Sequence, residues 1–324
     1  MCSALKELFG IEHPILLAPM GNVSGGALAA AVSNAGGLGL IGAGYGDADW
    51  LDREFQNAGE ARIGVGFITW ALARNPALLD LALAYEPEAV MFSFGDCTPF
   101  LPAVREAGAK IICQVQTLAQ ALDAAAADAD LIVAQGTEAG GHGGTRSTLT
   151  LVPAVVDAVA PTPVVAAGGI ADGRGLAAVC MLGASGALIG TRFFASEEAL
   201  GHSNAKRFIV ESRGDATVRT RVFDIVRGYP WPVHITGRVP LNRFSEQWHG
   251  REDALSADLA HQQRLYRDAE AADDTDTTVV FAGEDVDLID TVEPAAAIVA
   301  RLASEAYRLM GIPSTSDAKI GSVR

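Results

Sequence analysis

The chain has 324 residues, of which 49% are hydrophobic and 6% aromatic, enough for one large core or two small ones. Its formal charge of −15 excludes nucleic acid and anionic membrane surfaces as expected partners, because their phosphates would be repelled. The four cysteines have no metal-finger spacing, and neither a signal peptide nor a long uninterrupted apolar run is present, so we expect a cytoplasmic protein outside the membrane.

Short apolar runs alternate with alanine-rich segments through the first two thirds of the chain. The predicted strands are 15–17, 38–41, 63–67, 89–92, 110–113, 131–133, 163–166 and 187–189. The helices expected to follow them are 25–34, 48–57, 76–84, 99–107, 118–127, 152–159, 173–182 and 191–195. Continuous apolar runs indicate strands covered on both faces, and the alternation indicates a parallel sheet. Eight such units favour a closed (β/α)8 TIM barrel, with an open doubly wound sheet as the alternative.

The alternation stops after residue 196. Residues 197–290 are more charged and less periodic, and they predict a mostly helical insertion, or lid, over the barrel mouth. A helical pattern returns at 294–310, where Ile298, Leu302, Ala306 and Leu309 share one face. We therefore expect residues 1–196 and 291–312 to form the barrel.

A histidine follows the sixth predicted strand in a loop that is rich in glycine, from Ala134 to Gly144. The carboxyl ends of parallel strands are where α/β proteins place their chemistry. Imidazole titrates near neutral pH and can accept a substrate proton, which makes His142 the candidate catalytic residue rather than a plain surface histidine. Gln135 in the same loop, and Gln114 after the fifth strand, carry amides that both donate and accept and so suit the edge of a polar ring.

Two glycine turns end the last two predicted strands. Gly168 and Gly169 follow the seventh strand, and Gly190 and Thr191 follow the eighth. In (β/α)8 barrels these two loops commonly bind phosphate, because glycine lets the backbone approach the ligand closely. The chain has no dinucleotide fingerprint in its first βα turn and no P-loop lysine, so we expect a mononucleotide phosphate.

Together these segments resemble the nitronate monooxygenase family, formerly called 2-nitropropane dioxygenases. The resemblance spans residues 14–196 and is carried by Ala18-Pro19-Met20 and by residues 34–39, 134–144, 166–173 and 189–194. It implies FMN as cofactor on a (β/α)8 barrel, and oxidation of alkyl nitronates by O2 to a carbonyl compound and nitrite.

The resemblance also implies roles for individual residues. Ala18, Pro19 and Met20 would back the isoalloxazine ring, Gln135 and Gly140 would contact the flavin, and His142 would be the active-site histidine. The phosphate region would be held by Gly169, Leu188, Ile189, Gly190 and Thr191, and we add Gly66, Gln114 and Gly168 to the cofactor-binding candidates. Gly66 departs from the family pattern, because many relatives have asparagine there in a Gly-Val-Asn sequence.

Related FMN enzymes provide an alternative function: an NAD(P)H-fed reductase of enoyl-acyl-carrier proteins or of quinones. The charge of −15 weighs against an acidic carrier protein as substrate. The histidines form no metal-binding cluster in the sequence, so we expect no metal site. The expected partners are a small nitronate or nitroalkane and O2, and a homodimer remains open.

Overall fold

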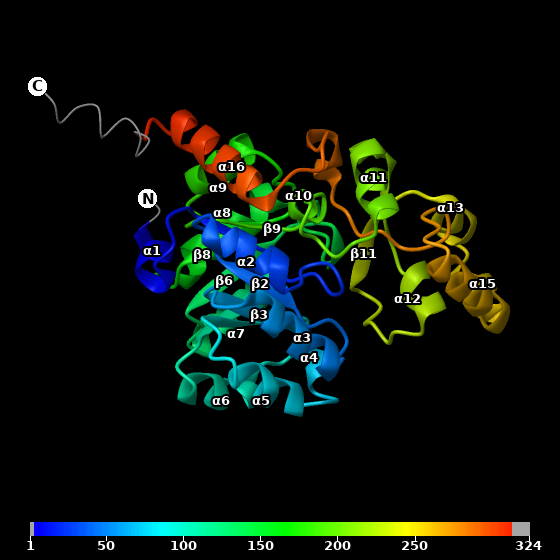
Figure 1. Cartoon of the computed structure of the whole chain (residues 1–324), viewed down its shortest axis with the longest axis horizontal. Coiled ribbons are helices and arrows are strands. Elements are labelled where there is room, and N and C mark those ends of the chain that lie inside the picture. The colour runs from blue at the N-terminus through cyan, green and yellow to red at the C-terminus, as the bar shows by residue number, and fades with distance from the viewer. Residues whose placement is uncertain (1–2, 313–324) are drawn as a thin grey trace, which may run out of the picture.

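The computed structural model describes residues 3–312 and contains an eight-stranded parallel sheet (Figure 1). Its strands are β1 Ile15–Leu17, β2 Gly39–Gly42, β3 Ile63–Ile68, β4 Ala89–Ser93, β5 Lys110–Val115, β6 Leu131–Gln135, β8 Val164–Ala167 and β9 Ala187–Ile189. All eight strands predicted from the apolar runs are present, with ends that differ by two residues or fewer. The local hydrophobic pattern is therefore sufficient to locate the sheet.

The sheet closes into a barrel. The strand order runs from β1 through β9, β8, β6, β5, β4 and β3 to β2, and a bridge between Leu16 and Leu38 joins its two ends. Across this seam the Leu17 N–H donates to the Leu38 carbonyl at 2.9 Å, and the Leu38 N–H donates to the Ile15 carbonyl at 3.0 Å. The predicted (β/α)8 barrel is confirmed, and the open-sheet alternative is wrong.

Helices cover the outside of the barrel. The main ones are α2 Gly26–Asn34, α3 Ala48–Ala58, α5 Ala77–Leu83, α6 Leu101–Glu106, α7 Leu118–Ala126, α8 Thr148–Val159, α9 Gly173–Met181, α10 Thr191–Phe194 and α16 Ala295–Leu309. Three further elements are α1 Ser3–Phe9, α4 Thr69–Leu72 and η1 Thr98–Phe100. The C-terminal helix α16 packs against α9 and α2 and completes the outer layer (Figure 1).

One helix boundary was predicted wrongly. Helix α8 begins at Thr148 rather than at residue 152, and Pro153 lies inside it. Proline is most common in the first turn of a helix, which is why the sequence pattern suggested the later start. Helix α7 illustrates the opposite case, because Thr117 and Gln120 form a complete capping box at the predicted position.

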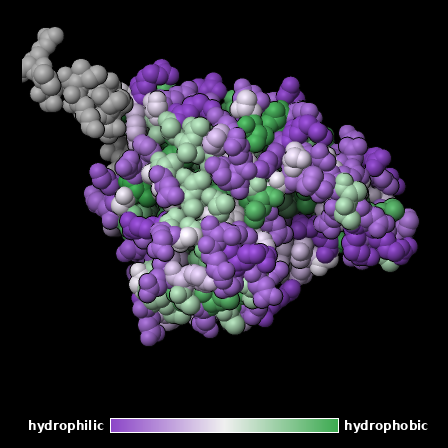
Figure 2. Space-filling view, in the orientation of Figure 1, coloured by the Kyte–Doolittle hydropathy of each residue, from purple (hydrophilic) through white to green (hydrophobic). Residues whose placement is uncertain are grey.

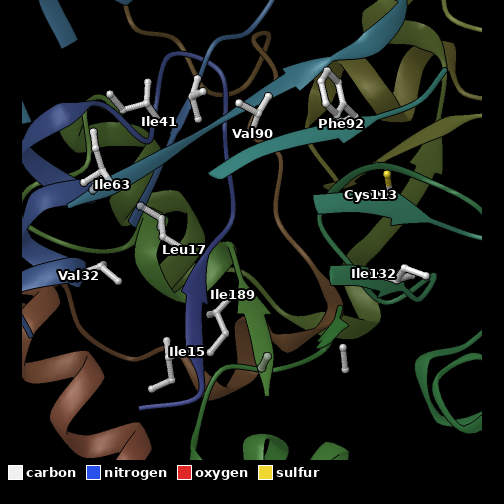
Figure 3. Close-up of a cluster of buried hydrophobic side chains, with 14 of the residues drawn as sticks. Ile15, Leu17, Val32, Ile41, Ile63, Val90, Phe92, Cys113, Ile132 and Ile189 are labelled. Atoms are coloured by element: carbon white, nitrogen blue, oxygen red, sulfur yellow. The ribbon is translucent and has the colours of Figure 1, made fainter. Parts of the chain in front are cut away.

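The strands bury side chains on both faces. Leu16, Leu40 and Met91 point into the barrel, where Leu5 and Phe9 of α1 pack against the same cluster. Their neighbours point outward and pack against the helices, as Figure 3 shows for Ile15, Leu17, Ile41, Phe92 and Ile132, among others. This double burial explains the continuous apolar runs, and it leaves the carboxyl ends of the strands to form the mouth of the barrel.

The segment after the barrel strands forms a lobe beside the barrel (Figure 1). Its helical elements are α11 Ser203–Glu211, η2 Gly214–Ala216, α12 Val222–Arg227, α13 Arg243–Trp248, α14 Glu252–Ala257, α15 Leu259–Ala271 and η3 Glu284–Leu288. The lobe has its own apolar cluster around Phe223, Phe244 and Tyr266.

The lobe also contains two strands that were not predicted. Strands β10 Thr217–Thr220 and β11 Thr236–Pro240 form an antiparallel sheet with β7 Gly141–Gly143. His142 lies opposite Gly237 in this sheet, so the expected glycine loop is in part a strand. A three-residue strand of glycine and histidine has no apolar alternation, which is why the sequence did not indicate it.

Polar residues cover most of the face seen in Figure 2, with apolar patches between them, including where the lobe meets the barrel. Within residues 3–312, no helix combines the length and the apolar character needed to cross a bilayer.

Candidate active site

A large pocket lies at the carboxyl ends of the barrel strands. Its empty volume, including space open to solvent, is about 1310 Å³. The pocket wall includes all the residues that the sequence singled out: Ala18, Pro19, Met20, Gly66, Gln114, Gln135, Gly140, His142, Gly168, Gly169, Leu188, Ile189, Gly190 and Thr191. The fold thus brings the ends of six barrel strands and strand β7, which contains His142, together around one cavity.

His142 is held by a carboxylate from the lobe. Its Nε2 lies 2.9 and 3.0 Å from the two carboxylate oxygens of Asp224 on α12, and the two side chains are only 8% and 5% exposed. An ionised carboxylate only accepts hydrogen bonds, so Nε2 carries a proton. Nδ1 has no hydrogen-bond partner among residues 3–312, which leaves this atom as the proton acceptor of the neutral ring.

Burial controls the protonation of His142. Removal from water lowers the pKa of the imidazole below its ordinary value, and the Asp224 carboxylate opposes this shift without cancelling it. Arg227 and Arg219 lower the pKa further. The ring is therefore neutral at pH 7, in the state that can accept a proton.

Aromatic side chains surround the imidazole. Trp231, from the segment between α12 and β11, stacks on it with ring centroids 3.6 Å apart and planes 7° apart. Phe281 lies at 5.2 Å and Phe94 at 6.4 Å. These rings keep water away from one face of the histidine and give this part of the pocket an apolar wall.

The aromatic contacts continue onto the barrel. The Trp231 indole donates a hydrogen bond to the Tyr45 hydroxyl at 3.1 Å, and Tyr45 stacks on Tyr229 at 3.7 Å. The Arg227 guanidinium lies 4.7 Å from the centre of the Tyr229 ring, and its Nη1 is buried without a hydrogen-bond partner. We call Tyr45, Tyr229 and Trp231 the aromatic cluster; it ties the lobe to the loop after β2.

Gln135 lines the pocket and also supports the strand that carries His142. Its Oε1 accepts hydrogen bonds from Gln114 at 3.2 Å and Gln116 at 3.0 Å, and its Nε2 donates to the His142 carbonyl at 3.1 Å. The amide therefore supports the strand that carries the histidine. Gln114 retains its own amide oxygen for a ligand, because the hydrogen bond above uses only its nitrogen.

The two glycine turns fit a phosphate group. Gly168 and Gly169 have φ of 104° and 74°, which side chains rarely adopt. The backbone N–H groups of Gly169, Gly190 and Thr191 make no hydrogen bond with other residues in the range 3–312. Unpaired N–H donors at a pocket wall are what an anionic phosphate requires.

Pro19 limits the space around Gly66. A Cβ atom on Gly66 would clash with Cβ and Cγ of Pro19, so a larger residue at this position would require the proline ring to shift.

Sequence reasoning missed the contributions of the lobe. Arg227, Trp231, Phe281 and Asp285 line the pocket, and Asp224 contacts His142; none of the five belongs to a motif that the sequence singled out. Asp224 is 82 residues from His142, and the pairing of β7 with β11 is one of the tertiary contacts that bring their segments together. The sequence contains no local signal that could have identified them.

Comparison with known proteins agrees with this architecture. The family model for nitronate monooxygenase matches residues 2–63 and 69–305, and the chain belongs to that family. A nitronate monooxygenase of Metarhizium robertsii is 33% identical, with 94% of each chain covered. The protein is thus an oxidoreductase of the flavin-dependent type that this family represents.

Two solved structures resemble the whole molecule. FabK from Thermotoga maritima superposes with a TM-score of 0.83 and 32% identity, over 95% of this chain and 96% of that one. A nitroalkane oxidase from Streptomyces ansochromogenes gives a TM-score of 0.79 and 31% identity, over 95% and 99%. The lobe and the barrel are therefore both shared with these enzymes.

Proposed function

We propose that this enzyme oxidises alkyl nitronates to a carbonyl compound and nitrite with O2, using bound FMN. The observation that carries the proposal is the pairing of His142 with Asp224 in the pocket that also contains the phosphate-compatible glycine turns. Family membership and the resemblance to a nitroalkane oxidase support the same chemistry.

Different residues of this chain would bind different parts of the cofactor. The free N–H groups of Gly169 and Gly190 would bind the phosphate, and Ala18, Pro19 and Met20 would support the ring. FMN, when bound, supplies the electron acceptor, whereas the protein supplies position and electrostatics. The apolar rings of Trp231 and Phe281 suit the alkyl part of a small substrate.

His142 has a role that depends on the form of the substrate. A nitronate already carries the electron pair to be given up, so no proton has to leave its carbon. A neutral nitroalkane must first lose its α-proton, and Nδ1 of the neutral imidazole is the group in the pocket that can accept it. The Asp224 carboxylate would stabilise the resulting imidazolium through Nε2.

The test is turnover of defined substrates by the protein loaded with FMN. Aerobic incubation with the nitronates of nitroethane and 2-nitropropane should consume O2 and release nitrite together with the matching aldehyde or ketone. In a parallel anaerobic experiment, the nitronate should bleach the flavin absorbance whereas NADH should leave it unchanged. Rapid bleaching by NADH without nitrite release in the first assay would instead identify a reductase.

A further inference from the structure

A buried carboxyl group lies next to the proposed phosphate turns and plays no part in the function above. Asp285, in η3, lines the pocket, although the residue is only 7% exposed. Its Oδ1 is buried and has no hydrogen-bond partner. Buried carboxylates are normally paired, so this oxygen lacks the partner that would stabilise a negative charge on it.

The position of Asp285 is fixed by its contacts with the end of β9. The N–H of Gly283, just before η3, donates to the Thr191 hydroxyl at 3.0 Å, and the Thr191 side chain also interacts with Asp285. Thr191 directly follows Gly190, one of the two phosphate turns. The carboxyl group therefore lies next to one of the two turns assigned to the phosphate.

The surroundings of Asp285 raise the pKa of its carboxyl group. Burial raises this pKa to about 6, and the negative charge of Glu284 acts in the same direction, whereas a backbone hydrogen bond from its own N–H, the Thr191 hydroxyl and the Arg192 cation act against the shift. Arg192 does not form an ion pair with Asp285 in the described part of the chain: it contacts Glu293 at 3.4 Å and donates to the carbonyls of Ala195 and Thr291. Glu284 is itself paired with Arg238 at 2.8 Å.

An ionised carboxylate here would repel a phosphate dianion across a short distance in a region of low dielectric constant. A protonated carboxyl group would instead donate a hydrogen bond to a phosphate oxygen. We propose that Asp285 binds the cofactor phosphate as the neutral acid, so that FMN binding takes up a proton at this residue. The inference rests on the proposed FMN site, and it adds a residue that makes cofactor affinity depend on pH.

The experiment is a fluorescence titration of the flavin-free protein with FMN and with riboflavin, at about pH 5.5 and about pH 8. Once the pH exceeds the pKa of the free carboxyl group, each further unit weakens binding by up to about tenfold. We expect the FMN dissociation constant to rise by at least about tenfold between the two pH values, whereas that of riboflavin, which has no phosphate, changes by less than about threefold.

The matched variants are Asp285→Asn, which keeps the shape and donates a hydrogen bond at every pH, and Asp285→Ser, which removes the carboxyl group. In both variants FMN affinity should be flat with pH or should improve slightly as the phosphate ionises (its second pKa is near 6). The role of Asp285 would be overturned if both variants kept the pH dependence of FMN binding. It would also be overturned if the affinity of the unmodified protein for riboflavin fell with pH as much as its affinity for FMN. Failure of every form to bind either flavin would instead remove the proposed function on which this inference rests.

Discussion

At the level of single residues, the opposing effects of burial and of Asp224 on the imidazole pKa determine what His142 can do chemically. Burial lowers the imidazole pKa more than the Asp224 carboxylate raises it, so the ring is a neutral base held in one orientation. Orientation comes from two directions, because Asp224 binds Nε2 and Gln135 binds the backbone carbonyl of the same residue. Asp224 and Gln135 thus fix the position of His142 before substrate binds.

Replacing His142 by alanine should separate binding from turnover. Turnover of a neutral nitroalkane should fall by about 10²- to 10⁴-fold, the usual contribution of a general base. FMN should remain bound, because the glycine turns at β8 and β9 are untouched. His261→Ala, a change at an exposed position on α15, serves as the control. Retention of full nitroalkane turnover by His142→Ala would remove the assigned role.

The pH profile tests the same residue without deleting it. For a neutral nitroalkane, kcat/KM should be highest where His142 is neutral and should fall as the pH drops through its pKa, which lies below 6.5. Asp224 raises that pKa, so Asp224→Asn should move the acid limb to still lower pH while reducing the maximum rate. An acid limb that moves to higher pH in this variant would contradict the account.

At the scale of the element, the barrel was predictable and the lobe was largely not. Each barrel strand is an apolar run because both of its faces are buried, and the glycines of the turns after β8 and β9 follow such runs, so this part of the cavity wall was predictable from the sequence. Strands β7, β10 and β11 are short and lack a clear alternation. Asp224 and Trp231 reach the pocket only through tertiary contacts made by those strands, and no sequence pattern encodes such contacts.

The aromatic cluster should hold the lobe against the barrel. Trp231 is 5% exposed and contributes both its stack on His142 and its hydrogen bond to Tyr45. Trp231→Ala should cost about 3–5 kcal/mol of unfolding free energy, as for other buried tryptophans, and should expose residues 222–235 to limited proteolysis.

Trp231→Phe is the matched control, because it keeps an aromatic ring for the stack and loses the indole N–H. Loss of the indole hydrogen bond should lower the unfolding free energy by only about 1 kcal/mol, in addition to the effect of the smaller ring. Equal resistance of all three proteins to denaturant and protease would show that the cluster does not anchor the lobe.

At the scale of the whole molecule, the pocket wall is shared by the barrel and the lobe. Barrel residues such as Met20 and Gly190 and lobe residues such as Trp231 and Asp285 face the same cavity. A ligand that fills this cavity therefore stabilises contacts on both sides, and its binding should be visible in the unfolding of the entire protein.

FMN should accordingly raise the thermal unfolding temperature. Free FMN at a hundred times its dissociation constant adds about 2.7 kcal/mol to the stability of the folded state, which should move the transition by a few degrees. Riboflavin at the same concentration should stabilise less, because it leaves the N–H groups of Gly169 and Gly190 unpaired. Identical shifts from the two flavins would indicate that the glycine turns do not bind phosphate.

A crystal structure of the protein with bound FMN would show where the flavin lies and how it is oriented. We expect phosphate oxygens at about 3 Å from the backbone nitrogens of Gly169 and Gly190, with the isoalloxazine ring in the part of the pocket lined by Met20 and His142. A flavin whose phosphate lies away from both turns, or whose ring is separated from His142 by the protein, would rule out this binding mode.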